Sequence, residues 1–245
     1  MADETFEEIF EELAKYNDRS VIWNNWLDYA IDVNLLTLHK NKSFKKNYLN
    51  NEKAYWDMIA AWTTELSTKL EKYPYYDILG EFYEELVQSK AKSSQMGQFF
   101  TPPSVTNLLS DLSFHNNLDY QNGIANDPAG GSGRTLLSAY VKSNGKVFCI
   151  SNDLDETSCK MCALNFFSHG IRGSVLHMDT LEEKFYQGWR VNKYLYHGIP
   201  VPHIEEINNV DDAYDFFELK KDNNVDKTTV APTTINTGNV QTTLI

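Results

Sequence analysis

The chain has 245 residues, of which 42% are hydrophobic and 13% aromatic, so it can bury a sizeable core in one or two domains and is not fibrous or disordered overall. Its 22 Lys+Arg against 34 Asp+Glu give a net charge of -12, which argues against a general nucleic-acid binder because phosphate contacts need Lys and Arg. An acidic N-terminus, no run of 18 apolar residues and only three cysteines predict a cytoplasmic protein without a signal peptide, membrane span or disulfide framework.

The first 90 residues contain four apolar stripes with three- and four-residue spacing, which is typical of amphipathic helices. Many of the apolar residues are Trp, Tyr and Phe, and we interpret them as core rather than as a ligand cage. We therefore predict an N-terminal helical domain over residues 1–90. Its expected helices lie near residues 6–13, 21–33, 55–70 and 78–87.

Beyond residue 90, short apolar runs alternate with helical patterns. This alternation predicts an α/β domain over residues 91–222 with an incomplete parallel sheet of about four strands. The expected strands are 124–126, 146–151, 174–177 and 189–196, and the expected helices start at Thr101 and span 133–142, 156–169 and 211–219. Residues 223–245 are polar, lack periodicity and are predicted to be a disordered tail.

A glycine-rich segment, Asn126-Asp127-Pro128-Ala129-Gly130-Gly131-Ser132-Gly133, lies between an expected strand and an expected helix. Glycines there let the backbone turn tightly and approach a ligand, and the following helix presents free N–H groups at its start. The next two strands end in Asn152-Asp153-Leu154-Asp155 and in His177-Met178-Asp179-Thr180. Acids at successive strand ends can accept hydrogen bonds from a ribose and an adenine, so the pattern predicts a nucleoside site.

Two other interpretations of these segments are weaker. A dinucleotide site would have Gly-x-Gly-x-x-Gly, and the third glycine is absent here. Cys159 and Cys162 have the spacing of a zinc or redox pair, but they lie within an expected helix and have no second pair. We therefore interpret both cysteines as core residues and predict no metal site.

Together, these segments and Gly97-Gln98-Phe99-Phe100-Thr101-Pro102 resemble the successive motifs of the N6-adenine DNA methyltransferases. The chain is most similar in kind to the modification subunits of type I restriction-modification systems, which carry out DNA methylation. The resemblance covers roughly residues 77–181. It implies a Rossmann-like methyltransferase core behind the helical domain, with S-adenosylmethionine as cofactor.

The resemblance also implies roles for individual residues. The segment with Gln98, Phe100 and Thr101 would close over the methionine end of the cofactor. The loop would cradle the amino-acid part, Asp153 would bind the ribose, Leu154 would pack on the adenine, and Asp179 would accept from the adenine amino group. The loop residues implied in cofactor binding are Asp127, Ala129, Gly131, Ser132 and Gly133.

The chain departs from the family at the acceptor side. Members carry an Asn/Asp-Pro-Pro-aromatic motif that holds the flipped adenine, and no such motif is present, since the only Pro-Pro pair is Pro102-Pro103. Asn192 and Tyr194 are the nearest candidates for a catalytic role. Two function classes remain open: an adenine-N6 DNA methyltransferase that is degenerate or completed by another chain, and a non-catalytic subunit that senses the cofactor or scaffolds a modification complex.

The net charge and the open edge of the expected sheet indicate which partners the chain could have. DNA contact would need a partner or the basic cluster of Lys40, Lys42, Lys45 and Lys46, although that cluster can equally be a solvated loop. An incomplete sheet exposes an edge after Tyr196, and exposed edges are usually covered. We expect residues 188–220, or else the helical domain, to cover it, and we expect a homodimer or a complex with a specificity subunit.

Overall fold

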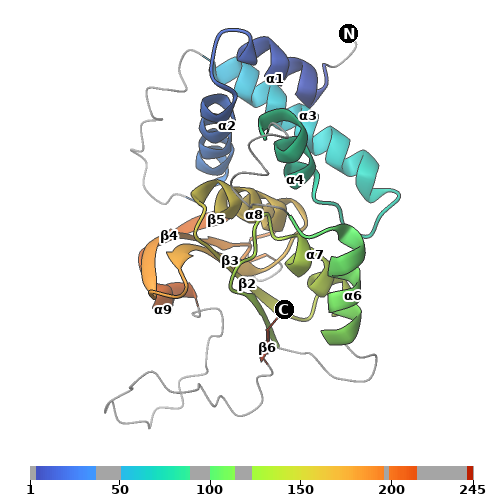
Figure 1. The fold of residues 1–245 in the computed structure, drawn as a ribbon, viewed down its shortest axis with the longest axis vertical. Coiled ribbons are helices and arrows are strands. Elements are labelled where there is room, and N and C mark those ends of the chain that lie inside the picture. Colours follow the sequence, from blue (N-terminus) through green and yellow to red (C-terminus); the bar gives the residue numbers. More distant parts are fainter. Residues whose placement is uncertain are drawn as a thin grey trace.

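The computed structural model describes residues 4–36, 51–88, 100–113, 123–195, 199–213 and 242–244. The basic cluster of residues 40–46, Gln98 and most of the predicted tail lie outside these ranges. The helices of residues 4–88 form one part of the molecule, and a sheet flanked by helices forms the other (Figure 1). A single cluster of buried apolar side chains runs through both parts, from Phe6 in the first helix to Ile204 in the sheet.

The helical part confirms the four predicted helices. Capping side chains start several of them: Thr5 and Glu8 form a capping box, and the carboxylates of Asp18 and Asp77 accept from N–H groups of the helices that follow them. The aromatic stripes are core as predicted, with fully buried indole rings at Trp23, Trp26 and Trp62. The elements are α1 (Phe6–Ala14), α2 (Arg19–Asn34), α3 (Glu52–Leu70), α4 (Ile78–Phe82) and the π-helical turn η2 (Tyr83–Val87).

The second part is an α/β structure, as predicted. Its sheet has the order β5-β4-β3-β2-β1-β6, and β1, β2 and β3 are parallel neighbours. The strands are β1 (Ile124–Asp127), β2 (Phe148–Asp153), β3 (Gly173–Asp179), β4 (Lys184–Val191), β5 (Ile204–Ile207) and β6 (Thr242–Leu244). The helices are α6 (Pro103–Ser113), α7 (Arg134–Lys142), α8 (Glu156–Ser168) and α9 (Val210–Ala213).

The expected parallel sheet is confirmed for β1, β2 and β3, but the strands after β3 are antiparallel. The chain reverses at residues 180–183, so β4 runs antiparallel to β3 and pairs Val191 with Gly173. β5 is antiparallel to β4 in turn. A turn of four residues can join only antiparallel neighbours, because a parallel crossover needs a dozen or more residues.

Both predicted covers are present, but they contact different strands. β5, within residues 188–220, pairs with β4. At the end of α2, the Leu36 N–H donates to the Ile204 carbonyl at 2.7 Å, and Leu35 forms a bridge with Ile204. The helical part therefore contacts the outer edge of β5 at an isolated bridge, and β5 is the last strand of the sheet on this side.

The predicted tail is described only at residues 242–244. These form β6, which pairs in parallel with β1 at Ile124, Ala125 and Asn126. These three residues add a strand to the sheet, and the expectation of a disordered tail stays a prediction. Of the predicted helix 211–219, the structure describes residues 211–213, which belong to α9.

Helix α8 lies between the sheet and the helical part (Figure 1). It contacts β2, β3 and β4 on one side and α2 and α4 on the other. This sandwiching explains why residues 158–166 are all buried, including Cys159 and Cys162, whose thiol pKa values burial raises. The interpretation of these two cysteines as core residues is confirmed.

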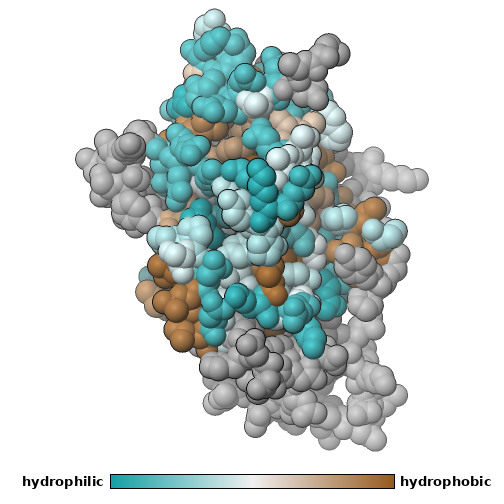
Figure 2. Space-filling model, turned by 90° about the vertical axis from the view of Figure 1, so that its right-hand side faces the viewer, coloured by the Kyte–Doolittle hydropathy of each residue, from teal (hydrophilic) through white to brown (hydrophobic). Residues whose placement is uncertain are grey.

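One face of the molecule is largely hydrophilic. Figure 2 shows the face at the right of Figure 1, where hydrophilic residues predominate and apolar patches lie towards the margins. Within the described ranges, no helix combines the length and the apolar character that crossing a membrane requires.

Candidate functional site

Three acidic side chains lie at one edge of the sheet. Asp127 ends β1, Asp153 ends β2 and Asp179 ends β3, and these strands are parallel. Their carboxyl ends therefore meet at the same edge, which is where ligands bind in open α/β sheets. A hydrogen bond from the Thr180 hydroxyl to the Pro128 carbonyl, at 3.1 Å, joins the loops after β3 and β1 across this edge.

The glycine loop is held against the end of β2 by two backbone donors. Gly130 N–H donates to the Asn152 carbonyl at 2.9 Å, and Gly131 N–H donates to Asp153 Oδ2 at 2.8 Å. Gly131 and Gly133 have φ of 55° and 87°, the left-handed region that favours glycine. A Cβ at Gly133 would also lie 2.7 Å from Cys162 Sγ. The sequence of the loop is thus required by both its conformation and its packing on α8.

Asp127 is a buried carboxylate whose charge is poorly compensated. Its side chain accepts from Ala129 N–H at 3.1 Å, and no cation pairs with it within the described residues. Burial raises the pKa of Asp127, and the nearby Asp153 adds to that effect. One residue before Asp153, the amide oxygen of Asn152 is buried without a partner in the described part of the chain. Such groups favour a ligand that brings a cation and hydrogen-bond donors.

The other predicted binding residues that the structure describes lie beside the glycine loop or at the ends of β2 and β3. The Phe100 ring lies over Gly131, where an added Cβ would come within 3.1 Å of it, and the Thr101 carbonyl accepts from Arg134 at 3.2 Å. Leu154 follows β2 with 61% of its surface exposed, so it is free to pack on a ligand. One oxygen of Asp179 accepts from two N–H groups of the turn after β3. Gln98 lies outside the described residues.

Ser132 is turned away from this edge. Its hydroxyl donates to the buried Asp77 at 2.5 Å, and only 1% of the residue is exposed. The Ser132 hydroxyl therefore binds the glycine loop to Asp77 and does not face the edge at which a ligand would bind. The role of Ser132 in cofactor binding stays a prediction, and in this structure that role would fall to the backbone of the loop rather than to the hydroxyl.

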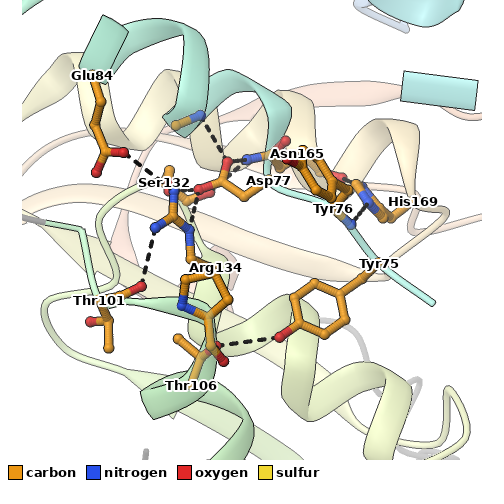
Figure 3. Close-up of polar contacts among 12 residues, drawn as sticks. Tyr75, Tyr76, Asp77, Glu84, Thr101, Thr106, Ser132, Arg134, Asn165 and His169 are labelled. Carbon is orange, nitrogen blue, oxygen red and sulfur yellow. Dashed lines mark hydrogen bonds and ion pairs between the residues drawn. The ribbon is translucent and has the colours of Figure 1, made fainter. Parts of the chain in front are cut away.

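Asp77 is the centre of a polar network that was not among the predicted site residues (Figure 3). The carboxylate accepts from Ser132, from Arg134 Nε at 2.9 Å and from Asn165 Nδ2 at 2.7 Å. Two sequence signals were available: an Asp before the apolar run at residue 78, typical of an N-cap, and an Asn within the otherwise apolar centre of α8.

The catalytic candidates lie at the opposite edge of the sheet. Because β4 is antiparallel to β3, its end at Val191 pairs with the start of β3 at Gly173, so Asn192 and Tyr194 are far from the carboxyl ends. Asn192 is fully buried and donates to the carbonyls of Phe166 and Ile171, at 3.0 Å each. Neither residue is placed to act on an acceptor held near the three acids, which corrects the suggestion of a catalytic role.

The comparisons with known proteins agree with the motifs. Residues 75–199 match the family model described as N-6 DNA Methylase. The chain is 29% identical over 103 residues to the Type I restriction enzyme HindI methylase subunit of Haemophilus influenzae, covering 39% of this chain and 22% of that protein. It is 30% identical over 99 residues to the MjaVIII methylase subunit of Methanocaldococcus jannaschii, covering 39% of this chain and 16% of that protein.

Among solved structures, the chain is similar to the methyltransferase subunit of the type I restriction-modification system from Streptococcus thermophilus. The identity is 24%, the TM-score is 0.34, and the match covers 49% of this chain and 25% of that one. The matched regions thus span a quarter or less of each relative's length.

Proposed function

Because the chain belongs to the N-6 DNA methylase family, we propose that it binds S-adenosylmethionine at the carboxyl edge of β1, β2 and β3. The observation that carries the proposal is the convergence of the glycine loop with Asp127, Asp153 and Asp179 at this edge. We propose that the bound cofactor would supply the methyl group for N6 of adenine in DNA.

Individual residues suit individual parts of the cofactor. The α-amino group is a cation that would offset the buried negative charge of Asp127, whose raised pKa reflects the cost of that burial. Asp153 would accept from the ribose hydroxyls, Leu154 would cover the adenine ring, and Asp179 would accept from the adenine amino group through its remaining oxygen. The segment with Gln98, Phe100 and Thr101 would close over the methionine end.

Asp153 offers the sharpest test of this site. Asp153→Ala should weaken binding of S-adenosylmethionine by about 1.5–3 kcal/mol, measured by calorimetric titration with the cofactor and with its demethylated product. Asp155→Ala is the matched control, because Asp155 caps α8 through Ser158 N–H at 2.8 Å and should cost about 1 kcal/mol of stability without changing affinity. Absence of binding by the parent chain, or equal affinity in both variants, would contradict the proposal.

The second candidate is a non-catalytic subunit that senses the cofactor or scaffolds a modification complex. It is favoured by the lack of an Asn/Asp-Pro-Pro-aromatic motif in the 245 residues and by the position of Asn192 and Tyr194 at the opposite edge. We expect no substantial transfer of radiolabelled methyl groups to DNA by the purified chain. Transfer that appears only when cellular partners are added would favour an enzyme completed by another chain, and none in either case would favour the second candidate.

Partners and location are also proposals. With a net charge of -12, we expect contact with DNA to depend on a partner or on the basic cluster of residues 40–46. We propose a cytoplasmic protein that forms a homodimer or a complex with a specificity subunit. Sedimentation at micromolar concentration and moderate salt tests the homodimer, since a single species near the chain mass of 28.2 kDa would reject it.

A further inference from the structure

Asp77 connects the helical part to three segments of the α/β part. Its carboxylate is almost fully buried, with 2% of the side chain exposed. One oxygen accepts from Ser132 in the glycine loop and from Arg134 at the start of α7, and the other accepts from Asn165 in α8 and from Gly80 N–H in its own helix. Four donors thus converge on a single side chain that belongs to neither the loop nor the sheet.

Arg134 extends this network to the other side of the loop. While Nε donates to Asp77, Nη1 donates to the Thr101 carbonyl at 3.2 Å, and the guanidinium lies 5.7 Å from the centre of the Phe100 ring. Phe100 in turn covers Gly131. The same guanidinium therefore contacts both the segment before α6 and, through Asp77, the base of the loop (Figure 3).

The residues next to Asp77 reinforce its position. The Tyr75 hydroxyl donates to Asn107 in α6 at 2.6 Å, and Tyr76 N–H donates to His169 Nε2 at the end of α8 at 3.3 Å. Asn165 also donates to the Ser132 carbonyl at 2.9 Å. Residues 75–77 thus have contacts to α6, to α8 and to the loop, so Asp77 has little freedom to move.

We propose that Asp77 is a positioning residue for the cofactor site, which holds the glycine loop through Ser132 and the segment at Phe100 and Thr101 through Arg134. This inference rests on the proposed function for its ligand, but the ordering of the loop is a property of the free protein. Replacing the carboxylate would leave the Arg134 side chain, which is 11% exposed, with Glu84 at 4.0 Å as its nearest carboxylate. The guanidinium would then reorient, and its contacts with Thr101 and Phe100 would be lost.

The test compares Asp77→Asn with Asp28→Asn. Both remove a carboxylate of the helical part that pairs with a cation of the α/β part, but the partner of Asp28 is Lys160 in α8, at 2.6 Å, away from the loop. In Asp77→Asn, hydrogen exchange of the free protein should be about tenfold faster at residues 129–136 and 105–106, because the hydrogen bonds that hold these segments are weakened. The Val105 and Thr106 N–H groups report on the segment before α6, because they donate to the Pro102 carbonyl at 2.9 and 3.1 Å. In Asp28→Asn the rates at these residues should stay at the parent value.

Two less disruptive variants test the contacts of Ser132 and of Arg134 separately. Ser132→Ala removes only the bond from the loop and should accelerate exchange at residues 129–136 but not at 105–106. Arg134→Lys keeps a cation beside Asp77 but loses the forked donors, so it should accelerate exchange at residues 105–106 and leave the rates at residues 129–136 closer to those of the parent. These variants test the proposal even where Asp77→Asn does not fold.

The cofactor supplies an independent measurement. Asp77→Asn should bind S-adenosylmethionine about tenfold more weakly, while Asp28→Asn should bind like the parent. Failure of the parent chain to bind would contradict the proposed function, yet the exchange comparison would still decide the role of Asp77. Equal exchange at residues 129–136 and 105–106 in the parent, Asp77→Asn, Ser132→Ala and Arg134→Lys would overturn the inference.

Discussion

The two ends of the sheet use polar residues in opposite ways. At the carboxyl ends of β1, β2 and β3, three acids meet, and Asp127 is buried without a cation among the described residues. At the other end, Asn192 and His203 satisfy each other: Asn192 N–H donates to the His203 carbonyl at 2.9 Å, and His203 N–H donates to Asn192 Oδ1 at 3.1 Å. Uncompensated charge thus marks the candidate site, and saturated hydrogen bonding marks a structural residue.

The largest effect on stability is expected for Asn192, at the end of the sheet where the polar groups are hydrogen-bonded to each other. Asn192→Ala should lower the free energy of unfolding by about 3 kcal/mol, because it leaves buried groups of Phe166, Ile171 and His203 without partners. Urea denaturation measures the loss. Asn192 has a φ of 57°, so Asn192→Gly should be less harmful by about 1 kcal/mol. Affinity of the folded protein for S-adenosylmethionine should not change, and a change would restore Asn192 as a site residue.

At the opposite end, Gly133→Ala should reduce both stability and affinity. Its φ of 87° and the contact of the new Cβ with Cys162 Sγ predict a loss of about 2 kcal/mol in thermal or urea unfolding. Adding Cys162→Ala removes the clashing atom and should recover part of the stability, leaving the strain of the backbone. If the double variant were no more stable than Gly133→Ala, close packing on α8 would not be the cause.

The uncompensated charge of Asp127 should make cofactor binding depend on pH. Burial raises its pKa, so the carboxylate is fully charged only above this raised value, and affinity should fall as the pH drops through it. Because the folded state holds this proton more tightly than the unfolded state, its contribution to the free energy of unfolding decreases as the pH rises from about 3.8 through the raised value. Asp127→Asn should bind about tenfold more weakly and remove both dependences. Titration calorimetry at several pH values measures the affinity for S-adenosylmethionine. The same pH dependence of affinity in the parent and in Asp127→Asn would contradict the prediction.

The smallest effect is expected at His169, which supports Tyr76 beside Asp77. Burial lowers the pKa of His169 from 6.5, although the hydrogen bond to the Asn165 carbonyl and the charge of Asp77 act against this effect. The unfolded state therefore takes up this proton first, so the contribution of His169 is complete above about pH 6.5 and decreases as the pH falls towards the lowered value. His169→Gln should flatten this part of the stability profile in urea titrations. If the free energy of unfolding depended on pH in the same way in His169→Gln, another group would be responsible for the dependence.

Much of the fold follows from local sequence patterns. The stripes of residues 6–13 and 55–70 and the buried run at 146–151 were recognisable because periodicity depends on neighbours along the chain. The glycine loop was recognisable for the same reason, since the left-handed conformations of Gly131 and Gly133 require these residues in this order.

What only the tertiary structure decided depends on residues far apart in the sequence. The direction of β4 moved Asn192 to the wrong end of the sheet, because reversing a strand exchanges its ends while leaving its apolar pattern unchanged. The hydroxyl of Ser132 faces Asp77, 55 residues earlier in the chain, and the sequence offers no periodic signal for such a contact. A buried carboxylate finds its donors wherever packing places them, so the partners of Asp77 could be known only after the helical part was seen against the loop.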